Sequence, residues 1–143
     1  MEIEEKRKKL ESYMDLADNL KSLQKAYEFK RTLAMKITAA AEGSEKGKSD
    51  YHANSAEKKI IDCAAALEAF TKCAEKFSAL EREIIQGMES IEDMSVQSIM
   101  RRYYLCGYSW EQIAEELNVA TETVKKKLQK GLCDIKFTEG ENG

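Results

Sequence analysis

Residues 103–132, which read YYLCGYSWEQIAEELNVATETVKKKLQKGL, carry the pattern of two short helices joined by a tight turn. Ser109 is a good N-cap, and Gln112 three residues later completes a capping-box pattern, so a helix is expected to begin at Trp110. Asn118 stands where the turn needs a residue that tolerates positive φ. A second helix is expected to follow this turn.

The spacing of small and branched residues indicates that the two helices cross closely. Ala114 leaves room for the crossing, Val124 ten positions later packs under both helices, and Val119 plugs the turn. A third, short amphipathic helix precedes them and ends near Gly107, which can adopt a left-handed conformation. A plain helical hairpin is the alternative to a helix-turn-helix. The core is expected to contain Val96, Ile99, Met100, Tyr103, Trp110, Ile113, Leu117 and Leu128.

We therefore predict a three-helix helix-turn-helix over residues 94–137, followed by a short tail at 138–143. A long amphipathic helix is predicted earlier in the chain, because apolar residues between Leu10 and Ile37 fall at steps of three and four with one gap. Residues 42–57 lose this periodicity and are interpreted as a flexible loop.

A heptad seam over the second half of residues 1–93 predicts a coiled-coil-like helix. Four heptads of apolar residues are interrupted only at Glu81. Residues 1–93 are therefore expected to form either a long helical hairpin within one chain or a coiled coil between chains. The seam consists of Ile60, Cys63, Leu67, Phe70, Ala74, Phe77, Ile84, Met88 and Ile91.

The composition fits an all-α fold. The 143 residues are 43% apolar and 34% charged, and they include no proline, which is costly inside helices. No apolar run approaches the roughly 20 residues that a membrane span needs. Because the first residues are charged and lack the apolar stretch of a secretory signal, we expect a cytoplasmic protein without membrane contact.

Metal and catalytic chemistry find little support in the sequence. The four cysteines form no close C-x-x-C pair, and His52 is the single histidine. No histidine is positioned as a base, and no glycine-rich phosphate loop is present. We therefore expect no metal site, no cofactor and no enzymatic activity.

Positive charge is concentrated locally. Residues 94–137 hold seven basic and five acidic side chains, whereas residues 1–93 have a net charge of −3. The basic run at residues 6–9 follows three glutamates, so we interpret it as a solvated helix start. These patterns favour a local nucleic-acid surface in the C-terminal module.

The segment of residues 103–132 resembles region four of sigma-70 family factors, the module that reads the promoter −35 element. The whole arrangement is similar to small phage and prophage regulators, including those described as ArpU-like, which place one or two long helices before such a module. This resemblance implies a transcription factor rather than an enzyme. Region-four modules also bind RNA polymerase, so polymerase is a second implied partner.

Two positions depart from the family pattern. Ala120 stands where the family usually has the Ser or Thr that caps the recognition helix, and Thr121 is expected to cap it one residue later. The arginine that often follows the cap is replaced by Thr121, which removes a bidentate contact to guanine.

The candidate DNA-binding residues lie on the recognition helix and on the helix before the turn. Bases are expected to be contacted by Thr121, Glu122 and Gln129, and phosphates by the lysines. Arg101 and Arg102 are expected to clamp the backbone at the rim of the groove. The complete set is Arg101, Arg102, Thr121, Glu122, Lys125, Lys126, Lys127, Gln129 and Lys130.

The sequence thus predicts a sequence-specific, DNA-binding transcriptional regulator of phage or prophage origin. Duplex DNA, RNA polymerase and a second copy of the chain are the expected partners. Two alternatives stay open: a small-terminase-type DNA-packaging subunit and a coiled-coil scaffold or adaptor without DNA binding. The scaffold would be indicated by duplex affinity that is absent at low salt.

Overall fold

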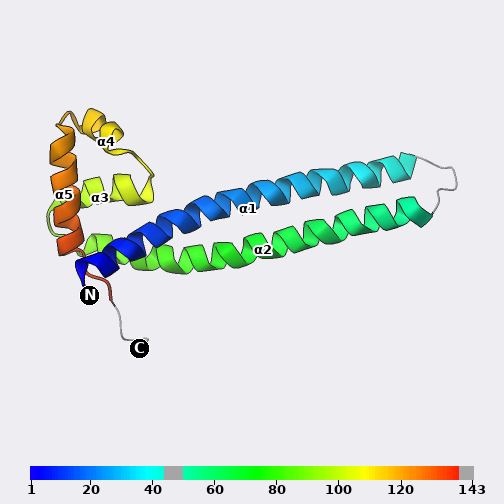
Figure 1. The fold of residues 1–143 in the computed structure, drawn as a ribbon, viewed down its shortest axis with the longest axis horizontal. Helices are drawn as coiled ribbons and strands as arrows, with labels where there is room; N and C mark the ends of the chain where they lie inside the picture. The colour runs from blue at the N-terminus through cyan, green and yellow to red at the C-terminus, as the bar shows by residue number, and fades with distance from the viewer. Residues whose placement is uncertain (44–49, 139–143) are drawn as a thin grey trace. The chain divides into compact units, whose positions relative to one another are not determined.

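The computed structural model describes the backbone of residues 1–43 and 50–138 and the side chains of residues 1–36 and 55–138. The described chain is all-α, as predicted, and contains no strand. Its elements in order are α1 (Ile3–Gly43), α2 (Asp50–Glu89), α3 (Met94–Met100), the π-helical turn η1 (Arg101–Leu105), α4 (Trp110–Leu117) and α5 (Thr121–Asp134) (Figure 1).

The long helices extend further than the sequence predicted. Helix α1 reaches Gly43 and α2 begins at Asp50, so the expectation of a loop over 42–57 is wrong for residues 42–43 and for the segment 50–57. That segment has neither glycine nor proline, and losing apolar periodicity removes a buried face without breaking the helical backbone. Residues 44–49 of the expected loop lie outside the described residues, as do residues 139–143 of the expected tail.

The chain forms two compact units. Unit 1 consists of residues 1–17 together with 77–143, and unit 2 consists of residues 18–76. The ends of both long helices therefore belong to the same unit as the short helices. Within the described residues, no helix has the length and hydropathy of a membrane span.

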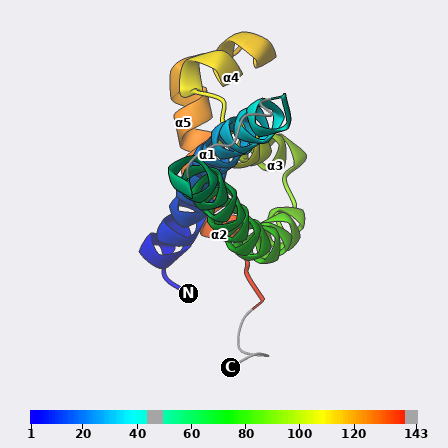
Figure 2. The same ribbon diagram turned by 90° about the vertical axis from the view of Figure 1, so that its right-hand side faces the viewer.

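In unit 2, the segments of α1 and α2 run side by side in both views (Figure 1 and Figure 2). The predicted stripe of α1 faces this contact: Leu20, Leu23 and Tyr27 are half-buried and Ala34 is buried. Polar contacts also cross it, because the Asn19 side-chain amide donates to Cys73 Sγ at 3.7 Å. The two helices thus pair as a hairpin within the chain.

The predicted heptad seam of α2 is only partly covered. Cys63, Phe70 and Ala74 are half-buried, but Ile60 and Leu67 are 52% and 42% exposed. A single partner helix covers only a narrow strip, and a seven-residue repeat drifts by about 20° per heptad around a straight α-helix. Ile60 and Leu67, which are seven residues apart and share one position of the heptad, lie beside the contact rather than in it.

In unit 1, one apolar core joins all the short helices to the ends of the long ones. Leu10 and Tyr13 come from α1, Ile84 and Met88 from α2, and Ile91 from the loop that follows. Each large, fully buried side chain contributes roughly 1.5–3 kcal/mol, so the short helices depend on these residues. The core is completed by Val96, Ile99, Met100, Tyr104, Ile113, Ala114, Val124, Leu128, Leu132 and Ile135.

Candidate nucleic-acid interface

The start of α4 has the predicted capping box. Gln112 N donates to Ser109 Oγ at 3.1 Å, and Ser109 N donates to Gln112 Oε1 at 2.8 Å. Two backbone donors that the helix leaves unpaired are thereby satisfied. Helix α4 accordingly begins at Trp110, as the sequence predicted.

The corner between α4 and α5 is also as predicted. Asn118 has φ 57° and ψ 50°, and its N–H donates to the carbonyl groups of Ala114 and Glu115. Val119 N donates to Ala114 O at 3.0 Å, so the end of α4 is closed by backbone hydrogen bonds. Among the described residues, Asn118 is the one non-glycine residue with positive φ.

The two helices pack through the small and branched residues that the sequence indicated. Ile113 and Val124 are fully buried, and Ala114 and Leu128 are almost so. The views of Figure 1 and Figure 2 both show α4 next to α5. The helix-turn-helix is therefore present, and the exposed face of α5 points away from the core.

Three local predictions at this corner are wrong. Val119 is 40% exposed and does not plug the turn, whereas Ile113 and Val124 are fully buried. Trp110 is 38% exposed, since it lies at the rim of the core and stacks on Tyr103 with ring centroids 6.4 Å apart. Thr121 is the first helical residue rather than the N-cap; Ala120 holds the cap position with an extended backbone and no side-chain bond.

The helix that precedes the turn differs from the predicted amphipathic helix. After α3, the chain widens into the π-helical turn η1, in which Cys106 N donates to Arg101 O at 3.0 Å. Gly107 then takes φ 77°, as expected of a helix terminus. The π turn buries Tyr104, and this burial raises the pKa of its phenol to about 12.

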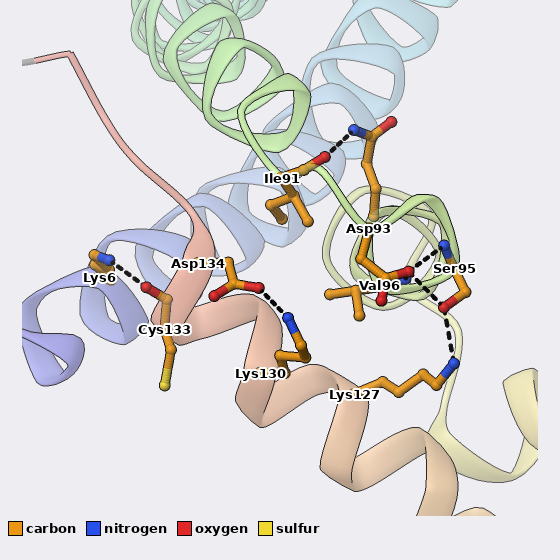
Figure 3. Close-up of polar contacts among 10 residues, drawn as sticks. Lys6, Ile91, Asp93, Ser95, Val96, Lys127, Lys130, Cys133 and Asp134 are labelled. Atoms are coloured by element: carbon orange, nitrogen blue, oxygen red, sulfur yellow. Dashed lines mark hydrogen bonds and ion pairs between the residues drawn. The ribbon is translucent and has the colours of Figure 1, made fainter.

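Asp93 is a structural residue that the sequence analysis did not single out. Its carboxylate caps α3 by accepting from Ser95 N at 3.0 Å and from the Ser95 hydroxyl at 2.8 Å (Figure 3). Hydrogen bonds from the Ser95 side chain and from the backbone N–H of Val96 hold the pKa of Asp93 below its ordinary value. An aspartate directly before an amphipathic run was the signal that could have revealed this cap.

The exposed face of α5 carries most of the predicted site residues. Glu122, Lys125, Lys126, Gln129 and Lys130 are exposed, whereas Thr121 and Lys127 are half-buried. A recognition helix that lies in the major groove of DNA presents such a row of charged and amide side chains to the bases and phosphates.

Several of these side chains have partners within unit 1. Lys125 Nζ lies 4.7 Å from the ring centre of Trp110 and 3.8 Å from the Glu122 carboxylate. On the flank toward α3, Lys127 Nζ donates to the Ser95 hydroxyl at 2.8 Å (Figure 3). These contacts orient the lysines along the surface of the helix.

The flank of α5 toward α3 also contains an ion pair. Lys130 Nζ lies 2.6 Å from Asp134 Oδ2 (Figure 3). The hydrogen bond and the charge of Asp134 raise the pKa of Lys130. Lys130 therefore stays a cation, but part of its charge is balanced within the helix.

The two arginines before the turn have different surroundings. Arg101 is exposed. Arg102 pairs through Nε with the Glu116 carboxylate of α4, and its guanidinium also donates to the Ser98 hydroxyl. Arg102 thus connects η1 to α4, and the prediction that both arginines clamp DNA is not tested by this arrangement.

The start of α1 lies against the C-terminal half of α5. Lys6 Nζ donates to Cys133 O at 3.1 Å (Figure 3), and Arg7 Nη2 donates to Gln129 Oε1 at 3.4 Å. The interpretation of residues 6–9 as a solvated helix start is therefore wrong for Lys6 and Arg7. No local signal could have revealed this contact, because more than 120 residues separate the partners.

A hollow of about 290 Å³ lies where α1, η1, α4 and α5 meet. Arg7, Lys125 and Gln129 all line it, together with Glu11. The start of α1 and the exposed side of α5 therefore share one continuous surface. Its remaining lining residues are Tyr103, Tyr104, Trp110, Leu128 and Leu132.

Residues 92–132 match the family model described as Sigma-70, region 4. The match covers α3, η1, α4 and most of α5, and it defines this part of the chain as a DNA-binding helix-turn-helix of the sigma-70 region 4 type. This type of module is not catalytic. No curated protein and no solved structure matches the chain.

Proposed function

We propose that this chain is a sequence-specific DNA-binding regulator of transcription in which α5 enters the major groove. The observation that carries the proposal is the exposed polar face of α5, which follows a left-handed corner within a region of the sigma-70 region 4 type. B-form DNA admits one α-helix in its major groove, and side chains on that face read the base edges.

The roles of the side chains follow from their positions. Glu122 and Gln129 are exposed and can accept or donate hydrogen bonds at base edges, while Thr121 lies at the first turn of the helix. Lys125, Lys126, Lys127 and Lys130 have cationic ends suited to phosphates. We assign Arg101, which is exposed on the preceding turn, a contact to the DNA backbone, and Arg102 a supporting role beside it.

A double substitution of Lys125→Glu and Lys126→Glu tests this proposal. We expect duplex binding to be lost in a gel-shift or fluorescence-anisotropy titration, because two phosphate attractions become repulsions. Thermal unfolding followed by circular dichroism is expected to change little, since both side chains are exposed.

Lys21→Glu with Lys25→Glu is the matched control. These lysines are also exposed, and they lie four residues apart on α1 in unit 2. Both variants replace two lysines by glutamates, so they change the net charge of the protein by the same amount. Unchanged affinity in the α5 variant, or an equal loss in the control, would contradict the assignment of α5 as the reading helix.

The finer biological role rests on the resemblance to phage and prophage regulators. We propose that the protein acts on phage or prophage genes and that the same module contacts RNA polymerase. Selection of operators from random duplexes, with and without polymerase, tests both points. Selection of the same site only when polymerase is present would support a joint complex, and enrichment of no sequence would reject specific reading.

Association through the long helices is supported by apolar side chains that the hairpin leaves exposed. Phe29, Met35, Ile60 and Ile61 are each more than half exposed in unit 2. We propose that a second copy of the chain covers part of this surface. Light scattering of the intact protein tests this, since a monomer would contradict it and a ring-sized assembly would favour the DNA-packaging alternative.

A further inference from the structure

The two flanks of α5 differ in charge. On the flank toward α3, Asp93 and Asp134 lie close to the lysines, as Figure 3 shows for Lys127 and Lys130. On the other flank, the start of α1 places Lys6 at Cys133 and Arg7 at Gln129. Positive charge from the beginning of the chain therefore borders the exposed face of α5.

This part of α1 is held firmly in unit 1. Leu10 is fully buried and Tyr13 nearly so, in the same core as Leu128 and Leu132 of α5. The Tyr13 ring stacks on Phe77 at 5.0 Å between centroids, and its hydroxyl donates to Glu81 at 3.0 Å. Lys6 and Arg7 are thus fixed beside α5 by packing one or two turns further along α1.

The major groove is about 12 Å wide, and an α-helix with its side chains has a diameter of about 10–12 Å. A helix in the groove therefore has a row of phosphates on each flank. Cations that border the helix on one flank come close to that row.

We propose that Lys6 and Arg7 contact DNA phosphates on one flank of α5, so that the DNA interface combines the start of α1 with the helix-turn-helix. This inference rests on the proposed function of α5. It adds a partner surface from a segment outside the region that matches Sigma-70, region 4.

Both side chains keep donors for a phosphate. A lysine ammonium has three donors and an arginine guanidinium has five. Lys6 donates to Cys133 O, and Arg7 donates to Glu4 at 2.7 Å and to Gln129. The Glu4 pair is solvent-accessible on both sides and therefore weak, so a phosphate can replace Glu4. Glu11 lines the hollow beside Arg7, and its carboxylate repels a phosphate there. A phosphate is therefore expected to contact the side of the Arg7 guanidinium that faces away from Glu11.

The decisive variant is Lys6→Gln with Arg7→Gln, compared with the matched control Lys21→Gln with Lys25→Gln. Binding of a selected duplex and of a random duplex is measured from low to high salt. We expect the slope of log affinity against log salt to become shallower by about 2 in the α1 variant, one unit for each phosphate contact. Affinity for both duplexes should fall on the order of tenfold at about 0.1 M salt, with their ratio unchanged.

Glu4→Gln is a second variant with the opposite expected effect. It removes the partner that competes for Arg7, so affinity for both duplexes should rise at low salt. Because Glu4 is exposed, this variant keeps the test decisive even where the double variant unfolds.

Trp110 fluorescence and the thermal transition report whether each variant is folded. A shallower slope in the double variant with a higher affinity in Glu4→Gln would establish the contact. A slope equal to that of the control, with loss of binding in the Lys125→Glu and Lys126→Glu variant, would overturn this inference and leave the proposed function intact. Absence of duplex binding by the unaltered protein would overturn both.

Discussion

Asn118 forms the corner between α4 and α5, and its conformation is one that most residues avoid. With φ at 57°, a Cβ atom comes close to the following carbonyl oxygen, which costs roughly 1–2 kcal/mol for an ordinary residue. Asparagine and glycine tolerate this region best. The single side chain at position 118 therefore affects how easily the whole corner forms.

We expect Asn118→Ala to lower the free energy of unfolding by about 1 kcal/mol, because alanine tolerates positive φ poorly. Asn118→Gly should stay within about 0.5 kcal/mol of the unaltered protein, since its conformational freedom helps the corner but also favours the unfolded chain. Urea unfolding followed by Trp110 fluorescence measures both. Equal stability of the two variants would show that the corner does not depend on residue 118.

At the scale of the element, α5 combines an outward polar face with a very close contact to α3. Gly131 is buried, and a Cβ atom placed there would lie 2.5 Å from Met100 Sδ. Met100 is itself fully buried and cannot move into solvent. The glycine thus lets α5 approach α3, at some cost in helix propensity.

Gly131→Ala should lower the free energy of unfolding by about 1–3 kcal/mol, because overpacking a tight core outweighs the gain in helix propensity. In the double variant with Met100→Ala, the added methyl group has space, so the effect of the alanine at 131 should become small or favourable. A double-mutant cycle in urea provides the coupling energy. Additive effects of the two substitutions would contradict the contact.

At the scale of the molecule, the short helices have no core of their own. Leu10 and Tyr13 come from the start of the chain and Ile84 and Met88 from the end of α2, and all four lie in one cluster with the residues of α5. The helix-turn-helix is therefore stabilised by segments that precede it by tens of residues. The same arrangement places Lys6 and Arg7 beside α5.

Leu10→Ala should destabilise unit 1 by about 2–5 kcal/mol, because the substitution leaves a cavity in this shared core. Trp110 is the chain's single tryptophan and reports on unit 1. Leu20→Ala, at a half-buried position of α1 in unit 2, is the matched control and should shift the Trp110 transition much less. Equal shifts would indicate that the two units unfold together.

Local chemistry explains why much of the helix-turn-helix was predictable. The capping box at Ser109, the corner at Asn118 and the buried positions of Ala114 and Val124 all involve partners within about ten residues. Helical periodicity and backbone capping depend on such short separations, so the residue order alone specifies them. The candidate DNA-binding residues of α5 followed from the same spacing, because the inward positions of this helix define its outward face.

Contacts between segments that are distant in the sequence could not be predicted from such local patterns. Three observations depend on which surfaces pack against each other in the folded chain. They are the exposure of Ile60, the position of Trp110 at the rim of the core and the contact of Lys6 with Cys133. An amphipathic pattern specifies that a face is buried, but it does not specify the partner or how wide a strip that partner covers. Packing in three dimensions decides both, and here it joins the start of α1 and the exposed side of α5 into one surface.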